Sequence, residues 1–276
     1  MKLLSSFLVA AALGALAVSA PATAQTGGSN AYTPSVGQEG KDVVWVPTAD
    51  VLVARMLDMA ELKPGDRLVD LGSGDGRTVI AAARRGVKSR GIEYNPDLVV
   101  LSRAAASTAG VSDMATFEQG DIFESDFSEA TVVTLFLLPA LNMRLRPILL
   151  DMPPGTRVVS NSFDMEDWQS DEMVEVDGAC TTWCRAYKWI VPAKVEGNWK
   201  IGNQQLALKQ TFQMLEGSLR GNGRTMAIED ARLEGARIRF SVGKQRYVGQ
   251  VDGDTIRGTI DGKTAWSAVR ETQAAR

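Results

Sequence analysis

The sequence predicts an α/β domain followed by an antiparallel β domain, and three observations lead to this fold class. Between residues 46 and 193, short apolar segments alternate with segments of helical periodicity. After Pro192, short alternating segments are separated by GNG, VDGD and IDGK, which are typical hairpin turns. Formal charge divides at the same place: residues 25–193 hold 15 basic and 24 acidic residues, whereas 194–276 hold 14 basic and 9 acidic. We therefore predict one domain over 46–193 and a small all-β meander over 194–276, which could close into a small barrel or half-barrel.

The first 24 residues are typical of a signal peptide for export. Lys2 precedes an almost wholly apolar run from Leu3 to Val18, and Ala22-Thr23-Ala24 is a small-x-small cleavage site before Gln25. An uncleaved membrane anchor is the alternative, but the run is near the lower length limit for a span. We expect a cleaved, periplasmic protein with no membrane span after cleavage. Residues 25–45 are polar and aperiodic, which predicts a flexible leader.

The composition excludes several kinds of catalytic site. The chain has no histidine, so Ser-His-Asp triads, Cys-His dyads and histidine-based zinc sites are absent. Cys180 and Cys184 are the only cysteines, and two cysteines make a poor metal site, so we expect no metal. In an exported protein a disulfide is their first interpretation, and two free thiols are the alternative.

The α/β elements are predicted in chain order from periodicity and from turn residues. A helix over 47–62, capped by Thr48 or Asp50, precedes the turn Lys63–Asp66 and a buried strand. The helix over 95–110 has an Asn95 cap, Pro96 at its first position and Gly110 at its end. Further strands are predicted over 67–72, 89–94, 115–121, 131–138 and 156–163, with helices over 76–85 and over 139–152, the latter interrupted or kinked by Pro147.

The alternation of strands and helices predicts a mainly parallel sheet joined by right-handed crossovers. The last two strands of this domain, over 172–178 and 184–192, have no helix between them. They should form a hairpin, so the sheet should end with an antiparallel strand.

A glycine-rich loop, DLGSGDG, joins the first predicted strand to the following helix. Gly72, Gly74 and Gly76 would let backbone N–H groups approach a ligand at the carboxyl end of the strand. The dinucleotide pattern G-x-G-x-x-G is not met, because Arg77 stands in place of its third glycine. The spacing therefore argues against NAD and favours a cofactor with an amino-acid end.

Three acidic residues end three successive predicted strands. Asp70 can accept from an ammonium group, Glu93 from both hydroxyls of a ribose, and Asp121 from an exocyclic amine with Ile122 against the purine. A solvated strand end is the alternative for each acid taken alone. Together with the glycine loop, they predict a nucleoside-containing ligand.

These residues resemble the class I, seven-stranded S-adenosylmethionine-dependent methyltransferases, over Val46 to about Pro192. VDLGSGDGR, GIEYNP and FEQGDI match the first three motifs of that class, and VPT before the first helix is similar to the non-SET lysine methyltransferases and their short bacterial relatives. The resemblance implies a Rossmann-like sheet with a terminal antiparallel hairpin, and S-adenosylmethionine as cofactor. The residues assigned to the cofactor site are Pro47, Thr48, Asp70, Gly72, Ser73, Gly74, Gly76, Glu93, Tyr94, Asp121 and Ile122.

The acceptor is predicted to be a lysine-type amine of a protein, or a small molecule. FLLPALN stands where nucleobase amino methyltransferases have Asn-Pro-Pro-aromatic, and the acidic charge of 25–193 disfavours nucleic acid. Asn142, just past the fourth strand, is the candidate catalytic residue that would orient the acceptor nitrogen, with a helix cap as its alternative role. The basic β domain could contact an anionic surface or the acidic domain, and a solvated charged face is the alternative. A non-catalytic exported binding protein on a methyltransferase scaffold is the competing hypothesis.

Overall fold

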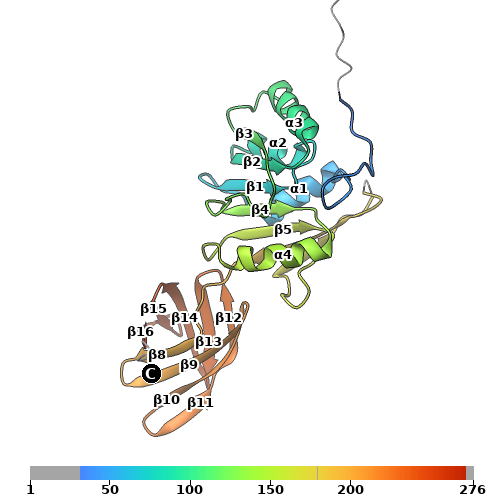
Figure 1. The fold of residues 1–276 in the computed structure, drawn as a ribbon. Helices are drawn as coiled ribbons and strands as arrows, with labels where there is room; N and C mark the ends of the chain where they lie inside the picture. The colour runs from blue at the N-terminus through green and yellow to red at the C-terminus, as the bar shows by residue number, and fades with distance from the viewer. Residues whose placement is uncertain (1–31, 179, 272–276) are drawn as a thin grey trace, which may run out of the picture. The chain divides into compact units, whose positions relative to one another are not determined.

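The computed structural model describes residues 32–178 and 180–271, which contain two separate β-sheets (Figure 1). The first sheet ends its chain course at Ile190, and the second begins at Gly197. The predicted signal peptide, residues 1–24, lies outside the described residues. Within the described residues, no helix is long and apolar enough to cross a membrane.

The first sheet has seven strands in the order β3-β2-β1-β4-β5-β7-β6. Strands β1 to β5 pair in parallel, whereas β7 runs antiparallel to both β5 and β6. The predicted parallel sheet with a terminal antiparallel hairpin is therefore confirmed. The strands are β1 (Arg67–Leu71), β2 (Lys88–Glu93), β3 (Ala115–Gln119), β4 (Val132–Leu135), β5 (Arg157–Asn161), β6 (Glu172–Glu175) and β7 (Arg185–Ile190).

Four helices cover this sheet, and their ends follow local signals in the sequence. The Asn95 side chain accepts a hydrogen bond from Asp97 N at 2.9 Å, and Pro96 occupies the first helical position, as predicted for α3. Helix α1 differs from its prediction, because its N-cap is Ala49 and no side chain caps it. Helix α4 continues through Pro147. The helices are α1 (Asp50–Met59), α2 (Arg77–Arg84), α3 (Pro96–Thr108) and α4 (Pro139–Leu150).

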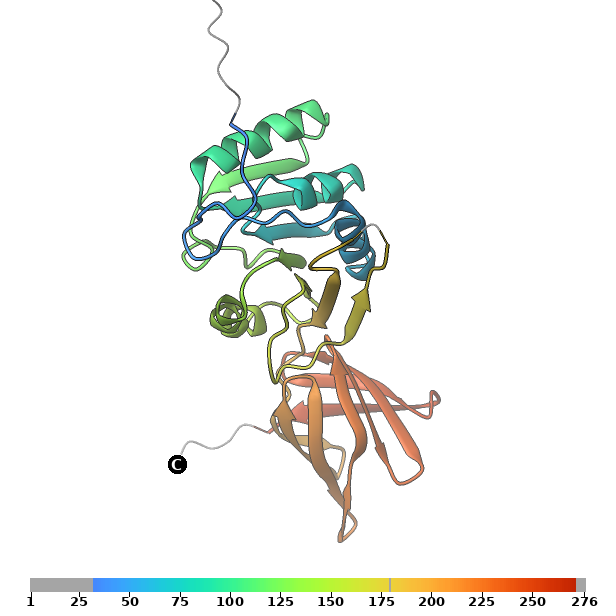
Figure 2. The same ribbon diagram turned by 90° about the vertical axis from the view of Figure 1, so that its right-hand side faces the viewer.

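The parallel strands bury side chains on both faces, as expected for a sheet covered by helices. On one face, Leu68 and Val132 pack in a buried cluster with α1. On the other face, their chain neighbours Val69 and Val133 pack with Leu145 of α4. The two-residue period of strands sends successive side chains to opposite helical layers. Figure 2 shows the blue segment that precedes α1 lying against this sheet.

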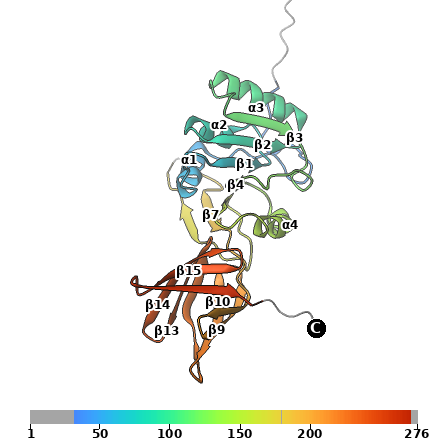
Figure 3. The same cartoon turned by 90° about the vertical axis from the view of Figure 1, so that its left-hand side faces the viewer.

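The second sheet is antiparallel throughout and closes on itself (Figure 3). Pairing of β9 with β10 joins the two ends of the strand series, so the sheet is barrel-like, which is one of the forms predicted for this domain. Trp199, Phe240 and Trp266 lie in its buried core. Its strands are β8 (Gly197–Ile201), β9 (Gln204–Thr211), β10 (Met214–Gly221), β11 (Arg224–Ala227), β12 (Glu229–Glu234), β13 (Arg237–Val242), β14 (Gln245–Asp252), β15 (Thr255–Ile260) and β16 (Thr264–Arg270).

Candidate active site

The glycine loop joins β1 to α2 in a left-handed backbone conformation. The φ angles of Gly72, Gly74 and Gly76 are +76°, +54° and +81°, a region that residues with a Cβ enter only with strain. The N–H groups of Gly72 and Ser73 donate to the carbonyl of Ile92 at 2.9 and 3.0 Å, which ties the loop to the end of β2. The concentration of glycines in the sequence therefore reflects a real backbone requirement.

The glycines of this loop contact different parts of the domain. A Cβ on Gly74 would lie 2.7 Å from Trp45 Nε1, on the side of the loop that lines a cavity. A Cβ on Gly76 would instead lie 2.7 Å from the Phe117 ring and 2.9 Å from Ser102, inside the packing between α3 and β3. The assignment of Gly76 to the cofactor site is therefore not supported by its position. Its glycine is required by close packing and by its left-handed place as the N-cap of α2.

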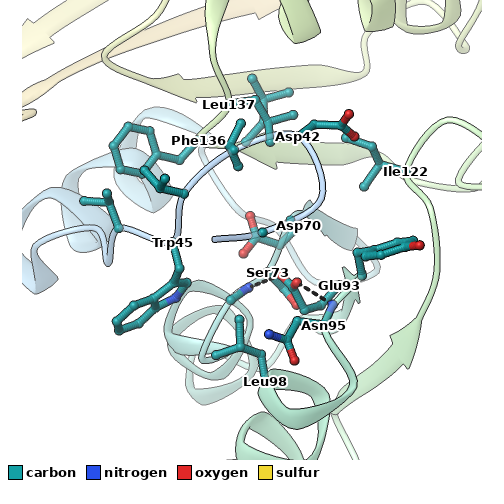
Figure 4. A pocket seen from close by; sticks show the side chains of 18 of the residues that line it. Asp42, Trp45, Asp70, Ser73, Glu93, Asn95, Leu98, Ile122, Phe136 and Leu137 are labelled. Carbon is teal, nitrogen blue, oxygen red and sulfur yellow. Dashed lines mark hydrogen bonds between the residues drawn. The ribbon is translucent and has the colours of Figure 1, made fainter. Parts of the chain in front are cut away.

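A cavity of about 220 Å³ lies at the carboxyl ends of the parallel strands. It brings together predicted residues from several segments of the chain, and Figure 4 shows Asp70, Ser73 and Glu93 at its base. Every predicted cofactor residue except Gly76 lines it: Pro47, Thr48, Asp70, Gly72, Ser73, Gly74, Glu93, Tyr94, Asp121 and Ile122.

Glu93 is held by backbone donors at the end of β2. Its Oε2 accepts from Gly74 N and its Oε1 from Asn95 N, each at 2.9 Å. Each carboxylate oxygen has a second lone pair, so these contacts orient the group and leave it able to accept from ligand hydroxyls. The predicted ribose acceptor is thus positioned by the glycine loop itself.

Asp70 is buried at the end of β1 and accepts a hydrogen bond from Thr134 Oγ1 at 2.7 Å. Burial raises the pKa of its carboxyl to about 7, and the nearby charges of Glu93 and Asp75 act in the same direction. The Thr134 hydrogen bond opposes the shift. A cationic ligand beside Asp70 would lower this pKa and favour the ionised carboxylate.

Asp121 is paired within the chain. Lys41 forms an ion pair with it and lies 5.0 Å from the centre of the Tyr94 ring, while Phe123 N donates to Asp121 at 2.9 Å. The hydrogen bond with Lys41 lowers the pKa of Asp121, and the same bond raises the pKa of Lys41. The Asp121 carboxylate was predicted to accept a hydrogen bond from the exocyclic amine of a purine. In the structure the Lys41 ammonium already pairs with this carboxylate.

The segment before α1 forms one wall of the cavity, as the resemblance implied for Pro47 and Thr48, but the part of this wall made by residues 37–45 was not predicted. The backbone of Trp45 exchanges hydrogen bonds with Gly37 and Gln38, and its indole lies against Gly74. In Figure 4 the chain from Asp42 to Trp45 arches over Asp70. This part of the predicted flexible leader is therefore packed on the site. The presence of Lys41 and Trp45 in an otherwise small and polar stretch was the available signal.

Thr48 connects this wall to the glycine loop and to the carboxyl end of β5. Its buried hydroxyl accepts from Asn161 Nδ2 at 3.1 Å, and its carbonyl accepts from Arg77 Nη1 at 2.8 Å. Arg77 is also paired with Asp75 in the glycine loop. These contacts join the start of α1, the glycine loop and the end of β5.

The opposite end of the cavity is apolar. Phe136 follows β4, Phe163 follows β5 and Trp183 precedes β7, and all three line the cavity. Their ring centroids lie 5.2 to 6.2 Å apart. The cavity thus has a carboxylate-bearing end at β1, β2 and β3 and an aromatic end at β4, β5 and β7.

Asn142 does not reach the cavity. It is completely buried in α4, and its Nδ2 donates to the carbonyls of Phe163 and Asp164 at 3.2 and 3.1 Å. The amide therefore supports the loop that follows β5, and neither the predicted contact with an acceptor nor the helix-cap role describes its position.

Cys180 and Cys184 lie on either side of the turn that leads into β7. Their Sγ atoms are 2.10 Å apart, which is disulfide-bonding distance, and their Cα atoms are 5.7 Å apart. Trp183 lies between these two cysteines in the chain. Within the described residues, no group of three or more acidic or cysteine side chains could hold a metal ion.

Comparison with known proteins identifies the class. The ANTKMT methyltransferase domain family matches residues 70–172. A protein-lysine N-methyltransferase from Saccharolobus islandicus is 41% identical over 138 residues, which cover 49% of this chain and 86% of that protein. The adenine nucleotide translocase lysine N-methyltransferase of Mus musculus is 38% identical over 119 residues, which cover 42% of this chain and only 52% of that protein.

One solved structure also covers this region. The crystal structure of an RNA methyltransferase from Salinibacter ruber in complex with S-adenosyl-L-homocysteine is 51% identical, with a TM-score of 0.51. The match covers 54% of this chain and 96% of that one. The chain therefore belongs to the class I S-adenosylmethionine-dependent methyltransferases, and its residues 70–172 are similar to the ANTKMT methyltransferase domain.

The residues of the cavity fit this cofactor. S-adenosylmethionine carries a sulfonium and an ammonium, and the cavity lining includes Asp70, Glu93 and Asp121 against a glycine loop that admits close backbone approach. The bound cofactor supplies a methyl group that is already activated for transfer. The protein has to bind it, align the acceptor and exclude water, so no histidine base is required.

Proposed function

We propose that this protein methylates the ε-amine of lysine residues in a protein acceptor. The observation that carries the proposal is the division of the cavity, with carboxylates at the cofactor end and an aromatic wall at the other. A lysine side chain has an apolar stem and a cationic head, and aromatic ring faces pack against the stem and attract the head. The names of the Saccharolobus and mouse relatives support the same acceptor class.

The proposed reaction needs only alignment and loss of one proton. The neutral ε-amine attacks the methyl carbon, a C–N bond forms and the C–S bond breaks, with its electron pair leaving on sulfur. The nitrogen then releases a proton to water. Burial of the amine among apolar side chains favours the neutral, nucleophilic form.

RNA is the second candidate acceptor, because the Salinibacter structure is named an RNA methyltransferase. The carboxylates of the cavity oppose it, since a phosphate backbone is recognised through cationic side chains. We therefore favour protein over nucleic acid.

The test is transfer of labelled methyl groups from S-adenosylmethionine into cell extract by the mature protein, residues 25–276. We expect label in protein, recovered as methylated lysine by mass spectrometry, and none with Glu93→Ala. Label in RNA alone would show that the acceptor is RNA and not protein. Cofactor binding without transfer to protein, RNA or the small molecules of the extract would favour a non-catalytic binding protein.

We also propose that the protein is exported to the periplasm after removal of residues 1–24. The apolar leader, the Ala22-Thr23-Ala24 site and the Cys180–Cys184 pair support this, because disulfides persist in oxidising compartments. Cell fractionation with mass analysis tests it: a soluble periplasmic chain that begins at Gln25 is expected. A cytoplasmic chain that retains Met1, or one held in the membrane, would contradict it.

The β domain is proposed to contact an anionic surface of the acceptor. Arg237 and Arg239 on β13 and Arg246 on β14 are exposed and line one surface pocket, where the three cations outnumber the single carboxylate of Asp261. Among the described residues, no ion pair involves any of the three. Substitution of all three arginines by glutamate should weaken the binding of acidic peptides, and the loss should be larger at low salt than at high salt. Unchanged binding would contradict this role of the β domain.

A further inference from the structure

Three aromatic side chains meet at one end of the cavity, from positions far apart in the chain. The centroids of Phe163 and Trp183 are 5.2 Å apart, and Phe136 lies 6.2 Å from each of them. The rings of Phe136 and Phe163 are stacked at 23°, whereas Trp183 is tilted against both. Two roughly parallel rings and one tilted ring thus form the aromatic wall, a cluster that lines this end of the cavity.

The sheet order separates this wall from the carboxylates at the other end. Strands β2 and β3 lie on one side of β1, and β4, β5 and β7 lie on the other. Glu93 and Asp121 therefore occupy one end of the cavity and the three rings the opposite end, with Asp70 of β1 between them. The end without ribose-type acceptors is the end left for an acceptor molecule.

The rings are held by contacts that do not depend on a ligand. The carbonyl of Phe163 accepts from Ser160 Oγ at 2.6 Å and from Asn142 Nδ2 at 3.2 Å. Trp183 lies between Cys180 and Cys184, whose Sγ atoms are at disulfide-bonding distance, and has a φ of +58°. A bulky residue in this conformation persists only where its surroundings fix it, and such residues gather at functional sites.

The wall offers ring faces to a ligand. Trp183 is 48% exposed, although tryptophan is usually well buried. The cation–π contacts within the described part of the chain involve other rings, Tyr94, Phe123, Trp199 and Phe212. Within the described residues no cation contacts any of the three rings, so the ring surface that lines the cavity can meet a cation from outside the chain.

We infer that Phe136, Phe163 and Trp183 form a box that binds the acceptor's ε-ammonium, including its mono- and dimethylated forms. This rests on the proposed function. Aromatic faces attract a quaternary or methylated ammonium, which has little need of hydrogen-bond acceptors. The box therefore retains the partly methylated lysine and leads to the trimethylated product. Each round forms one C–N bond, breaks one C–S bond and releases one proton while the amine still carries one, and the rings act as neither acid nor base.

The box lies partly outside the region that matches the family. Residues 70–172 contain Phe136 and Phe163, whereas Trp183 and both cysteines follow that region. Trp183 is accordingly the residue in which this chain would adjust the extent of methylation beyond what the shared region provides.

The first experiment measures preference for charge at constant shape. The mature protein saturated with S-adenosyl-L-homocysteine is titrated with Nα-acetyl-trimethyllysine amide and with its neutral analogue, in which carbon replaces the quaternary nitrogen. We expect the cation to bind at least tenfold more tightly. Trp183→Ala and Phe163→Ala should abolish this preference, whereas Trp183→Phe should retain most of it.

Controls separate the box from the cofactor site and from the fold. Met214→Ala removes a side chain of similar exposure, 50%, from β10 and should leave the preference unchanged. Affinity for S-adenosyl-L-homocysteine and the melting temperature should stay within twofold and within a few degrees in every variant. Equal binding of the cation and its neutral analogue by the unaltered protein would overturn the inference.

The second experiment follows the product. In the extract assay, the unaltered protein should yield mainly trimethyllysine, and Trp183→Ala should shift the product to mono- and dimethyllysine. If lysine is methylated and Trp183→Ala leaves the product ratio unchanged, the box is wrong while the proposed function stands. If the cation preference is present but lysine is not methylated, the proposed function is wrong and the box binds another alkylammonium.

Discussion

The two ends of the cavity are built in different ways. The carboxylate end comes from β1, β2 and β3 with their following loops, so its residues appear as short contiguous motifs between Asp70 and Ile122. The aromatic end takes single residues from after β4, after β5 and before β7. A cofactor shared by many enzymes needs a standard backbone cradle, whereas an acceptor site needs only suitable surfaces at one edge. The difference teaches that the site for the methyl donor can be predicted from sequence motifs, whereas the site for the methyl acceptor cannot.

The largest effect that would sharpen this comparison is expected from Gly74→Ala. A Cβ there meets Trp45 Nε1 at 2.7 Å and stands in a backbone at φ +54°, so affinity for S-adenosyl-L-homocysteine should fall at least 100-fold by calorimetry. Gly253→Ala is the matched control, because Gly253 has the same φ with nothing within 4 Å. An equal loss in both variants would mean that strain alone, and not the cradle, was measured.

A smaller effect is expected from Glu93→Gln. The substitution replaces the carboxylate, whose two oxygens accept from Gly74 N and Asn95 N, with a neutral amide that keeps only one acceptor oxygen. Loss of a charged hydrogen bond costs about 1.5–3 kcal/mol, so cofactor affinity should fall about 10- to 150-fold. Glu118→Gln, on the adjacent strand β3, should change nothing, and trimethyllysine binding by the cofactor-free protein should persist in both. Loss of that binding as well would show that the two ends act as one site.

Acidification should weaken cofactor binding through Asp70. Since its pKa is raised to about 7, only about a tenth of the carboxyl is ionised at pH 6, and affinity for the cationic cofactor should fall about tenfold between pH 8 and 6. Calorimetry across this range measures it, and Asp70→Asn should remove the dependence. A dependence that survives in Asp70→Asn would assign it to another group.

The raised pKa of Asp70 has the opposite effect on the stability of the ligand-free protein, which acidification should increase. Above about pH 4 the unfolded chain loses this proton, whereas the folded protein keeps it up to about pH 7. The contribution of Asp70 to the free energy of unfolding should therefore decline from pH 4 to 7 and level off above. Denaturant titrations of Asp70→Asn and the unaltered protein should diverge in this window.

The smallest effect is expected from Lys41→Met. Removal of the ammonium frees Asp121 from an ion pair at the partly exposed cavity wall, and solvent screening makes such pairs weak. Cofactor affinity should rise up to about fivefold, while Lys63→Met, in an exposed turn, should have no effect. Weaker binding in Lys41→Met would indicate that Lys41 assists the bound cofactor.

Several features could be predicted from local signals. Asn95 and Pro96 mark the start of α3 because capping and a fixed φ act within one turn. The terminal hairpin followed from the missing helix between residues 178 and 184. The pairing of Cys180 with Cys184 could be proposed because only two cysteines exist, four positions apart.

Other features depended on contacts between distant residues. Gly76 and Gly74 are indistinguishable in the motif, yet one faces Phe117 and the other Trp45. Asn142 follows β4 as an acceptor-orienting residue should, but the β5 loop folds over it and takes its amide. Residues 37–45 have no periodicity, and only the position of Asp121 and Gly74 gives Lys41 and Trp45 their partners.

The sequence by itself determined the alternation of strands and helices, the order of the acidic strand ends and the methyl-donor class, because these depend on local periodicity, turn residues and short spacings. The tertiary structure alone decided which strands pair to close the second sheet, the wall made by residues 37–45 and the meeting of Phe136, Phe163 and Trp183. Each of these requires segments far apart in the chain to be brought together. Burial and strand order decide such encounters, and no local pattern of residues records them.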